Sequence, residues 1–347
     1  SLLAVKEACG SAWDEKTLSA DLKTALRGLY VLYGEEGYLV ARYTEQIAKK
    51  AVCDDLGGFN LQRFDGETAD AAQLEEAIDA LPLMAERKCV VVRDLDITAG
   101  DRAERLLPLL EDLPETTVVV LYYMQLQPQM KNAKWKRLLE AATKGGAAVC
   151  FAKKTPAELS RTLCSGATRR GCTLTPQNAA LLVQQCGEDM LLLTNELDKL
   201  AALADGGEIT AEMIRTAATK NLEARVFDLS KALLRHRRDE AFSILDTLLQ
   251  QREEPVGILA VLTNSYVDMY RMKVAQIAKK SASEVAAAFP TYKGKEFRLR
   301  YAAQDAAGLS VEQLRRALAV LAGADTALKS SGTQARFVLE TTLTKLL

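Results

Sequence analysis

The chain has 347 residues, of which 48% are apolar and 26% are charged, a composition typical of a globular protein with two or three domains. Its formal net charge of −1 predicts no overall attraction to nucleic acid or to a membrane, so any basic surface must be local. His236 is the only histidine, which argues against a Ser-His-Asp hydrolase and against a His-rich metal site.

Residues 1–20 are uninformative, and the first clear element is the apolar run Leu29–Tyr33, which has the length and composition of a strand. It ends at a glycine-containing turn and leads into a helical stretch that extends to about Ala51. Helical periodicity recurs later, with an i, i+3, i+4, i+7 pattern that begins at Leu74 and a further helix that begins near Leu106. Four more strands are predicted at Phe59–Phe64, Cys89–Arg93, Thr116–Tyr122 and Ala147–Phe151. Strands that alternate with helices predict a parallel sheet covered by helices.

Beyond about Lys154 the strand pattern stops and the chain is helical to its end. Short helices are predicted at Pro156–Arg169, at Pro176–Cys186, at Met190–Ala204 and after the predicted cap Thr210. Longer helical elements are predicted at 226–250, 256–279, 310–327 and 332–347. The expected fold class is therefore α/β plus all-α: an α/β domain over 1–154, a small helical domain over 155–222 and a larger helical domain over 223–347.

The turn after the first strand has the position of a phosphate-binding loop but lacks the chemistry of one. A strand that runs through a glycine turn into a helix is the geometry that cradles phosphate. Here the turn consists of Gly34, Glu35, Glu36 and Gly37, and no Lys-Ser/Thr pair follows. Two carboxylates would face a triphosphate where a lysine is needed. We therefore expect no ATP hydrolysis, no catalytic residue, and no cofactor or metal; an ordinary strand–turn–helix junction is the alternative interpretation.

Asp94 follows the third strand, where a Walker-B carboxylate would hold magnesium. Because the turn has no lysine to act with it, we expect Asp94 to be a helix cap or a surface charge.

Two local groups of basic residues could contact phosphates. Basic residues outnumber acidic ones between Arg271 and Arg300, where Tyr292 or Phe297 could stack on an exposed base. A second group surrounds Trp135. A solvated helix face is the other interpretation for both groups. The candidate DNA contacts are Lys279, Lys280, Lys293, Lys295, Arg298 and Arg300 in the first group and Lys131, Lys134, Lys136 and Arg137 in the second.

The seven cysteines are scattered without a C-x-x-C pair or a recognisable secretory leader, which predicts no disulfide framework and a location in the reducing cytoplasm. Cys89 and Cys150 lie inside apolar runs and are expected to be small buried residues. No run approaches the roughly 18 apolar residues of a membrane span, so no membrane contact is expected.

Five segments in this order resemble the delta subunits of bacterial DNA polymerase III clamp loaders: Tyr30–Leu39, Leu81–Asp94, Gly187–Leu200, Val226–Leu229 and Ala324–Ser331. The resemblance extends from about residue 20 to the end. It implies an AAA+ parallel-sheet domain with a degenerate P-loop, a helical lid domain and a C-terminal helical collar that mediates oligomerisation.

The resemblance also implies a function without intrinsic catalysis, within a DNA polymerase (nucleotidyltransferase) holoenzyme. Such a subunit binds the ring-shaped sliding clamp, the beta subunit, and helps open one interface of the ring for loading onto primed DNA. Its implied partners are the gamma/tau and delta prime subunits of the loader, and primer–template DNA through the assembled complex. Two other functions remain open: an active AAA+ ATPase of the same architecture, and an unrelated helical adaptor with a vestigial nucleotide fold.

In this family an apolar pair near the end of the helix before the third strand holds the clamp, and the matching residues here are Leu83 and Met84. Pro82 would interrupt the helix and let the pair project, and a methionine adapts to an irregular pocket. A small apolar wedge beside charged residues resembles an interface hot spot with its rim. The alternative is that both side chains belong to the core. Many relatives carry an aromatic residue where Met84 stands.

Overall fold

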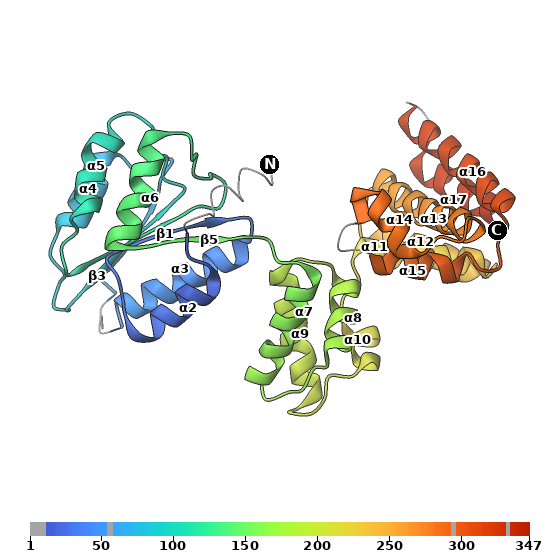
Figure 1. Cartoon of the computed structure of the whole chain (residues 1–347), viewed down its shortest axis with the longest axis horizontal. Helices are drawn as coiled ribbons and strands as arrows, with labels where there is room; N and C mark the ends of the chain where they lie inside the picture. Colours follow the sequence, from blue (N-terminus) through green and yellow to red (C-terminus); the bar gives the residue numbers. More distant parts are fainter. Residues whose placement is uncertain (1–11, 54–57, 293–295, 331–333) are drawn as a thin grey trace. The chain divides into compact units, whose positions relative to one another are not determined.

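A computed structural model of the chain describes residues 12–53, 58–292, 296–330 and 334–347 (Figure 1). The chain divides into two compact units, Ser1–Lys154 and Thr155–Leu347. The division of the second unit near residue 222 stays a prediction. In the part of the chain that the structure describes, no helix combines the length and the hydropathy that a bilayer span requires.

The first unit is built on a sheet of five strands that are all parallel, in the order β2-β3-β4-β1-β5. Every predicted strand is present, and the bounds differ from the predicted ones by at most two residues. The central strands are buried, whereas β2, at the edge, is partly exposed along its length. The bounds are β1 (Leu29–Gly34), β2 (Leu61–Asp65), β3 (Lys88–Arg93), β4 (Thr117–Tyr122) and β5 (Gly146–Phe151).

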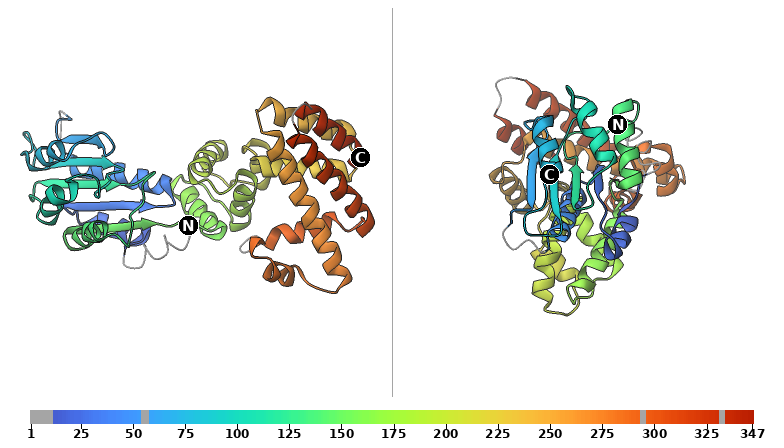
Figure 2. Two further views of the ribbon diagram at one scale, coloured as in Figure 1. Left: turned by 90° about the horizontal axis from the view of Figure 1, so that it is seen from above. Right: turned by 90° about the vertical axis from the view of Figure 1, so that its left-hand side faces the viewer.

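Helices cover both faces of this sheet (Figures 1 and 2). Side chains alternate between the faces of a strand, so Leu29, Val31 and Tyr33 of β1 point into the same core. That core is closed by α4 (Ala71–Asp79), α5 (Arg102–Glu111) and α6 (Ala133–Gly145), while α2 (Glu15–Thr24) and α3 (Gly37–Ala51) contact the sheet from the other side. The predicted parallel, helix-covered sheet is confirmed.

Trp13, just before α2, hydrogen-bonds alongside β5, which the sequence did not indicate. The Trp13 amide donates to the Ala148 carbonyl at 2.8 Å, and the Cys150 amide donates to the Trp13 carbonyl at 3.0 Å. Asp14 then caps α2, because its carboxylate accepts the Thr17 amide at 2.8 Å.

Cys89 and Cys150 are buried, as predicted. Cys150 is also disulfide-bonded, which the scattered cysteines of the sequence did not indicate. The other described cysteines are free thiols: Cys53, Cys89, Cys164, Cys172 and Cys186.

The second unit is helical. Its first three helices have the predicted bounds, α7 (Pro156–Arg169), α8 (Pro176–Cys186) and α9 (Met190–Ala204), and α10 (Ala211–Ala217) follows the cap Thr210. The remaining helices are α11 (Leu222–Leu234), α12 (Arg238–Gln250), α13 (Pro255–Ile277), α14 (Ala282–Ala288), α15 (Glu296–Asp305), α16 (Val311–Lys329) and α17 (Ala335–Leu346), with a 3-10 turn at Pro290–Tyr292.

The single helix predicted over 226–250 is wrong, because the chain forms α11 and α12 with a turn between them. His236 lies in the left-handed region at φ 53°, and its amide donates to the Leu233 carbonyl at 3.0 Å. The next amide, of Arg237, donates to the Ala232 carbonyl at 2.9 Å, which satisfies the end of α11. The helices α14 and α15 were not predicted as separate elements.

Candidate functional site

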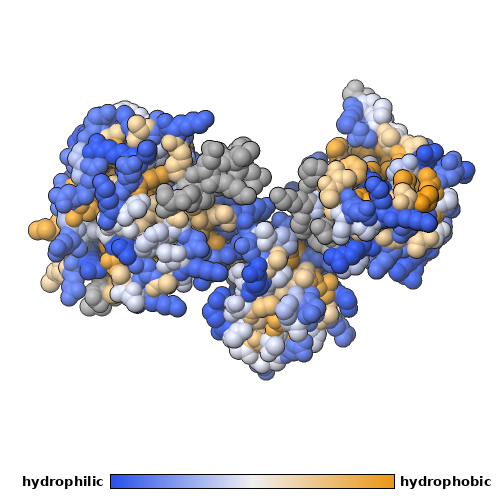
Figure 3. Space-filling model, viewed as in Figure 1, coloured by the Kyte–Doolittle hydropathy of each residue, from blue (hydrophilic) through white to orange (hydrophobic). Residues whose placement is uncertain are grey.

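The loop of residues 80–87, between α4 and β3, carries three exposed apolar side chains. Leu81 is 84% exposed, Leu83 is 58% exposed and Met84 is 99% exposed. Hydrophobic residues also reach the mostly hydrophilic surface of this unit in the space-filling view (Figure 3). The alternative that Leu83 and Met84 belong to the core is therefore wrong. We call residues 80–87 the apolar loop.

The apolar loop starts where α4 can no longer continue. The helix ends at Asp79, and the residue before Pro82 avoids helical geometry for steric reasons. The buried side chain of Lys88 closes this end, because its Nζ donates to the Ala77 carbonyl at 2.7 Å and also to the Ala80 carbonyl. Burial lowers the pKa of Lys88.

Asn60, which is 3% exposed, fixes the backbone of the apolar loop. Its Oδ1 accepts the Leu83 amide at 2.7 Å, and its Nδ2 donates to the Leu83 carbonyl at 2.9 Å. The carbonyl of Asn60 accepts the Cys89 amide at 2.7 Å, which ties the same residue to the start of β3. Met84 follows in the left-handed region at φ 51°. The backbone is thus held from inside while the apolar side chains remain in solvent, an arrangement that lowers the ordering cost of binding.

The roles of Asn60 and Lys88 were not predicted from the sequence. Each lies next to the start of a predicted strand, but neither belongs to a motif. Their partners are carbonyls and amides elsewhere in the chain, which have no sequence signature.

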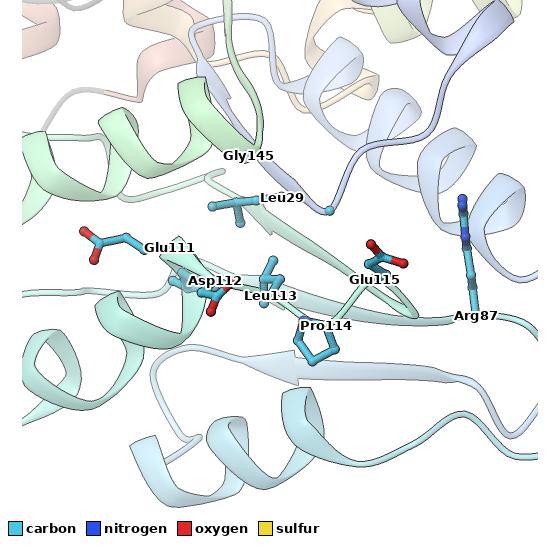
Figure 4. Close-up of a pocket in the computed structure, with 10 residues that line it drawn as sticks. Leu29, Arg87, Glu111, Asp112, Leu113, Pro114, Glu115 and Gly145 are labelled. Atoms are coloured by element: carbon cyan, nitrogen blue, oxygen red, sulfur yellow. The ribbon is translucent and has the colours of Figure 1, made fainter.

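A shallow hollow of about 390 Å³ lies beside the apolar loop, at the amino ends of the strands. Arg87, the last residue of the loop, stands at one end of it, and Glu111 stands at the other end with Glu115 between them (Figure 4). Glu111 is paired with Arg137 at 2.6 Å. The other lining residues are Gly28, Leu29, Leu110, Asp112, Leu113, Pro114 and Gly145.

At the opposite, carboxyl edge of the sheet, the degenerate phosphate turn is already hydrogen-bonded within the protein. The Gly34 amide donates to Gln127 Oε1 at 3.2 Å, and the Glu36 amide donates to the Phe151 carbonyl at 3.0 Å. Gly34 has φ 128°, and a Cβ there would lie 2.3 Å from the Phe151 oxygen. Two backbone amides that a phosphate would need are therefore engaged.

The carboxylates of this turn differ in exposure: Glu35 is exposed, whereas Glu36 is 8% exposed. Gly37 begins α3, and a Cβ on it would lie 3.3 Å from the terminal methyl of Met124. The loop after β4 therefore packs directly against the start of α3.

Asp94 organises that same loop. Its Oδ1 accepts the amides of Met124, Gln125 and Leu126 at 2.8, 2.9 and 3.1 Å. Burial alone would raise the pKa of Asp94, but these amides and the Arg93 guanidinium lower it below its ordinary value. The prediction of a helix cap or a surface charge is wrong, because Asp94 is buried and caps a loop. Among the described residues, no cluster of His, Cys, Asp or Glu is arranged to hold a metal.

The candidate DNA contacts of the second unit differ in how exposed their side chains are. Lys279 and Lys280, just after α13, and Arg300, on α15, are exposed. Arg298 is half-buried and pairs with the buried Asp268 at 3.0 Å. Lys293 and Lys295 lie outside the described residues.

Tyr292 is buried, so the prediction that it could stack on a base is wrong. Its hydroxyl donates to Asp268 Oδ1 at 2.5 Å and accepts a hydrogen bond from Arg271 at 2.6 Å. The Arg271 guanidinium also lies 4.2 Å from the centre of the Phe289 ring. The side chain of Phe297 lies outside the described residues.

The basic group around Trp135 surrounds an aromatic ring that is not available for stacking. Trp135 is fully buried and packs edge-on against Tyr123, with ring centres 5.2 Å apart. Lys134 pairs with Glu104 at 3.1 Å, and Arg137 pairs with Glu111. The aromatic ring is therefore part of the core, and half of the four basic residues are paired with carboxylates.

Comparisons with known proteins agree on one family. The family model described as "DNA polymerase III, delta subunit" matches residues 30–144, and the model of its C-terminal domain matches residues 223–346, so the two together span more than half of the chain. The chain is 25% identical over 330 residues to DNA polymerase III subunit delta of Bacillus subtilis, with 94% of each protein covered. It is 23% identical over 317 residues to that of Escherichia coli, with 90% of this chain and 89% of the relative covered.

A solved structure shares the fold. The DNA clamp loader delta protein of Bacillus subtilis matches with a TM-score of 0.56 and 24% identity, over 95% of this chain and 98% of that one.

Proposed function

The chain belongs to the family of DNA polymerase III delta subunits, and from that premise we propose that it binds the sliding clamp through Leu83 and Met84 and opens one interface of the ring. The observation that carries this proposal is the apolar loop, whose side chains are exposed while its backbone is fixed by Asn60. Exposed apolar side chains on a rigid support bind a partner with little loss of conformational entropy.

Two apolar side chains that become buried on binding are enough to anchor such a contact. Residues that fill a pocket at the centre of an interface carry most of the binding energy, and the charged residues around them, here Glu86 and Arg87, form a hydrated rim. A subunit that prefers the open ring shifts the ring towards opening by its differential affinity for the two states. No nucleotide chemistry by this chain is required for that step.

The proposed partners are the beta clamp, the gamma/tau and delta prime subunits, and primer–template DNA through the assembled loader, in the cytoplasm. The proposal assigns ATP binding to other subunits and no intrinsic activity to this one. It is supported by the degenerate turn, where the amides of Gly34 and Glu36 are bonded to Gln127 and Phe151. Those bonds also argue against an active ATPase, and family membership does not favour an unrelated adaptor.

The test uses the full chain and the cognate clamp. Replacing Leu83 and Met84 together by alanine should weaken clamp binding by at least about thirtyfold, as expected for two hot-spot residues, without changing the melting temperature. The matched control replaces Leu191 and Leu203, which are 54% and 57% exposed on α9, and should bind the clamp normally. Normal binding by the first variant would show that the apolar loop is not the site.

Ring opening is measured separately. A clamp labelled with a fluorophore pair across one interface should report opening when the chain is added without ATP, and no opening with the double variant. Opening that requires ATP hydrolysis by this chain alone would favour the ATPase function instead.

A further inference from the structure

Phe59 is a large aromatic side chain that is 70% exposed in the turn before β2. Gly58, at φ 69°, turns the chain just before it, and Asn60, just after it, points into the protein. Single exposed hydrophobic residues are common, so exposure alone means little. The exposure of Phe59 is significant because this side chain lies beside the apolar loop.

Two features bring Phe59 beside the apolar loop. The strands β2 and β3 are neighbours with Leu61 paired to Cys89, so the segments that lead into them enter the sheet side by side. The side-chain amide of Asn60, the residue after Phe59, hydrogen-bonds to the backbone amide and carbonyl of Leu83. The turn that carries Phe59 is therefore attached directly to the segment that carries Leu83 and Met84.

We propose that Phe59 is a further contact residue for the sliding clamp and forms one apolar surface with Leu81, Leu83 and Met84. This inference rests on the proposed function, because it takes the clamp as the partner. The four side chains are between 58% and 99% exposed and come from two segments that Asn60 holds together. A rigid aromatic side chain adds apolar contact area at a low cost in conformational entropy.

This surface would fit an apolar groove on the ring. The groove would be longer than Leu83 and Met84 alone could fill. Leu83 and Met84 would fill its centre, and Phe59 would cover its side. Truncation of a well-packed interface aromatic is expected to weaken binding about tenfold.

The first experiment measures the affinity of the full chain for the cognate clamp. Phe59→Ala should weaken binding about tenfold, and Phe59→Leu, which stays apolar, should weaken it less. Phe337→Ala, which removes an aromatic side chain that is 63% exposed on α17, is the matched control and should bind like the unchanged chain.

The outcomes separate this inference from the proposed function. If the Leu83 and Met84 double variant loses clamp binding while Phe59→Ala binds within twofold of the unchanged chain, the contact of Phe59 is overturned and the function stands. If the double variant also binds normally, the proposed function fails at this site.

A second measurement does not depend on truncation. A photoreactive phenylalanine analogue at position 59 should cross-link to the clamp, as should one at position 84, whereas one at position 337 should not. Cross-linking from position 84 without cross-linking from position 59 would overturn the inference even if Phe59→Ala lowered the affinity by disturbing the loop.

Discussion

The carboxamide of Asn60 exchanges two hydrogen bonds with the backbone of Leu83, at 2.7 and 2.9 Å, across a separation of 23 residues. The Asn60 side chain pairs with the backbone of the apolar loop, between α4 and β3, as a neighbouring strand would. A buried amide that is satisfied on both sides holds one geometry, because leaving either group unpaired is costly.

Asn60→Ala is therefore expected to weaken clamp binding about tenfold although Leu83 and Met84 remain in place. The loop would have to be ordered on binding, and that ordering lowers the affinity. The same change should cost about 1–3 kcal/mol of stability, because the Leu83 amide and carbonyl lose their partner. Calorimetric titration with the clamp and urea unfolding measure the two effects.

The control for this variant is Asn178→Ala. Asn178 donates from its Nδ2 to the Ile209 carbonyl at 3.0 Å in the second unit, so its loss should lower stability but leave the clamp affinity unchanged. Equal clamp affinities for the Asn60 and Asn178 variants would show that Asn60 does not position the loop.

Asp94→Asn tests the loop after β4. Asparagine keeps the left-handed backbone and one acceptor oxygen but removes the charge, so we expect a loss of about 1–2 kcal/mol at pH 7. The pKa of Asp94 lies below its ordinary value of 3.8 when folded, so its stabilising contribution is present above that value and is lost as the pH falls through the folded pKa.

Urea unfolding from pH 7 to about pH 3 should accordingly show the two proteins converging below roughly pH 4. The exposed Asp112, changed to asparagine, serves as the control and should follow the unchanged chain at pH 7. A difference that stays constant down to about pH 3 would contradict the assigned role of the Asp94 charge.

Gly34→Ala should destabilise the sheet unit by about 2–5 kcal/mol, because the new Cβ would lie 2.3 Å from the Phe151 oxygen at a φ that L residues rarely adopt. Gly308→Ala is the matched control, since no atom lies within 4 Å of its Cβ position, and it should change stability by less than about 0.5 kcal/mol. Thermal unfolding compares them, and equal midpoints would show that the turn can rearrange.

Charge reversal of Lys279 and Lys280 to glutamate should weaken binding of primer–template DNA by the assembled loader. The salt dependence of log K should become shallower by about one unit for each phosphate that the chain no longer neutralises. Reversal of Lys16 and Lys23, which are both exposed on α2, changes the net charge equally and is the control. If log K depends on salt in the same way for both pairs of variants, Lys279 and Lys280 do not contact DNA.

The sequence predicted the fold where its local signals were strong. The apolar runs that became β1 and β3 could be recognised because buried parallel strands are apolar throughout. The bounds of α7 and α8 could be read to the residue, since Thr155 and Thr175 cap them and a proline follows each cap. His236 carries no such signal: neither a glycine nor a proline marks the turn, so one helix was predicted where there are two.

The candidate site was only partly predictable, because its decisive contacts join distant residues. Leu83 and Met84 could be named from the resemblance, but their exposure depends on Asn60 and Lys88, whose partners are backbone groups. Tyr292 has the residue type that stacks on a base, but Asp268 and Arg271 hold its hydroxyl inside the protein.

The amides of Gly34 and Glu36 are hydrogen-bonded within the protein, and this affects what can control the time at which the chain binds the clamp. Under the proposed function, the sheet unit reaches its active conformation by folding alone. Nucleotide hydrolysis does not switch it to a second conformation. The moment at which the apolar loop meets the ring must then be set by where neighbouring subunits hold this one. Substitutions at the turn should change how much functional protein a cell contains, whereas substitutions at subunit contacts should change when that protein acts.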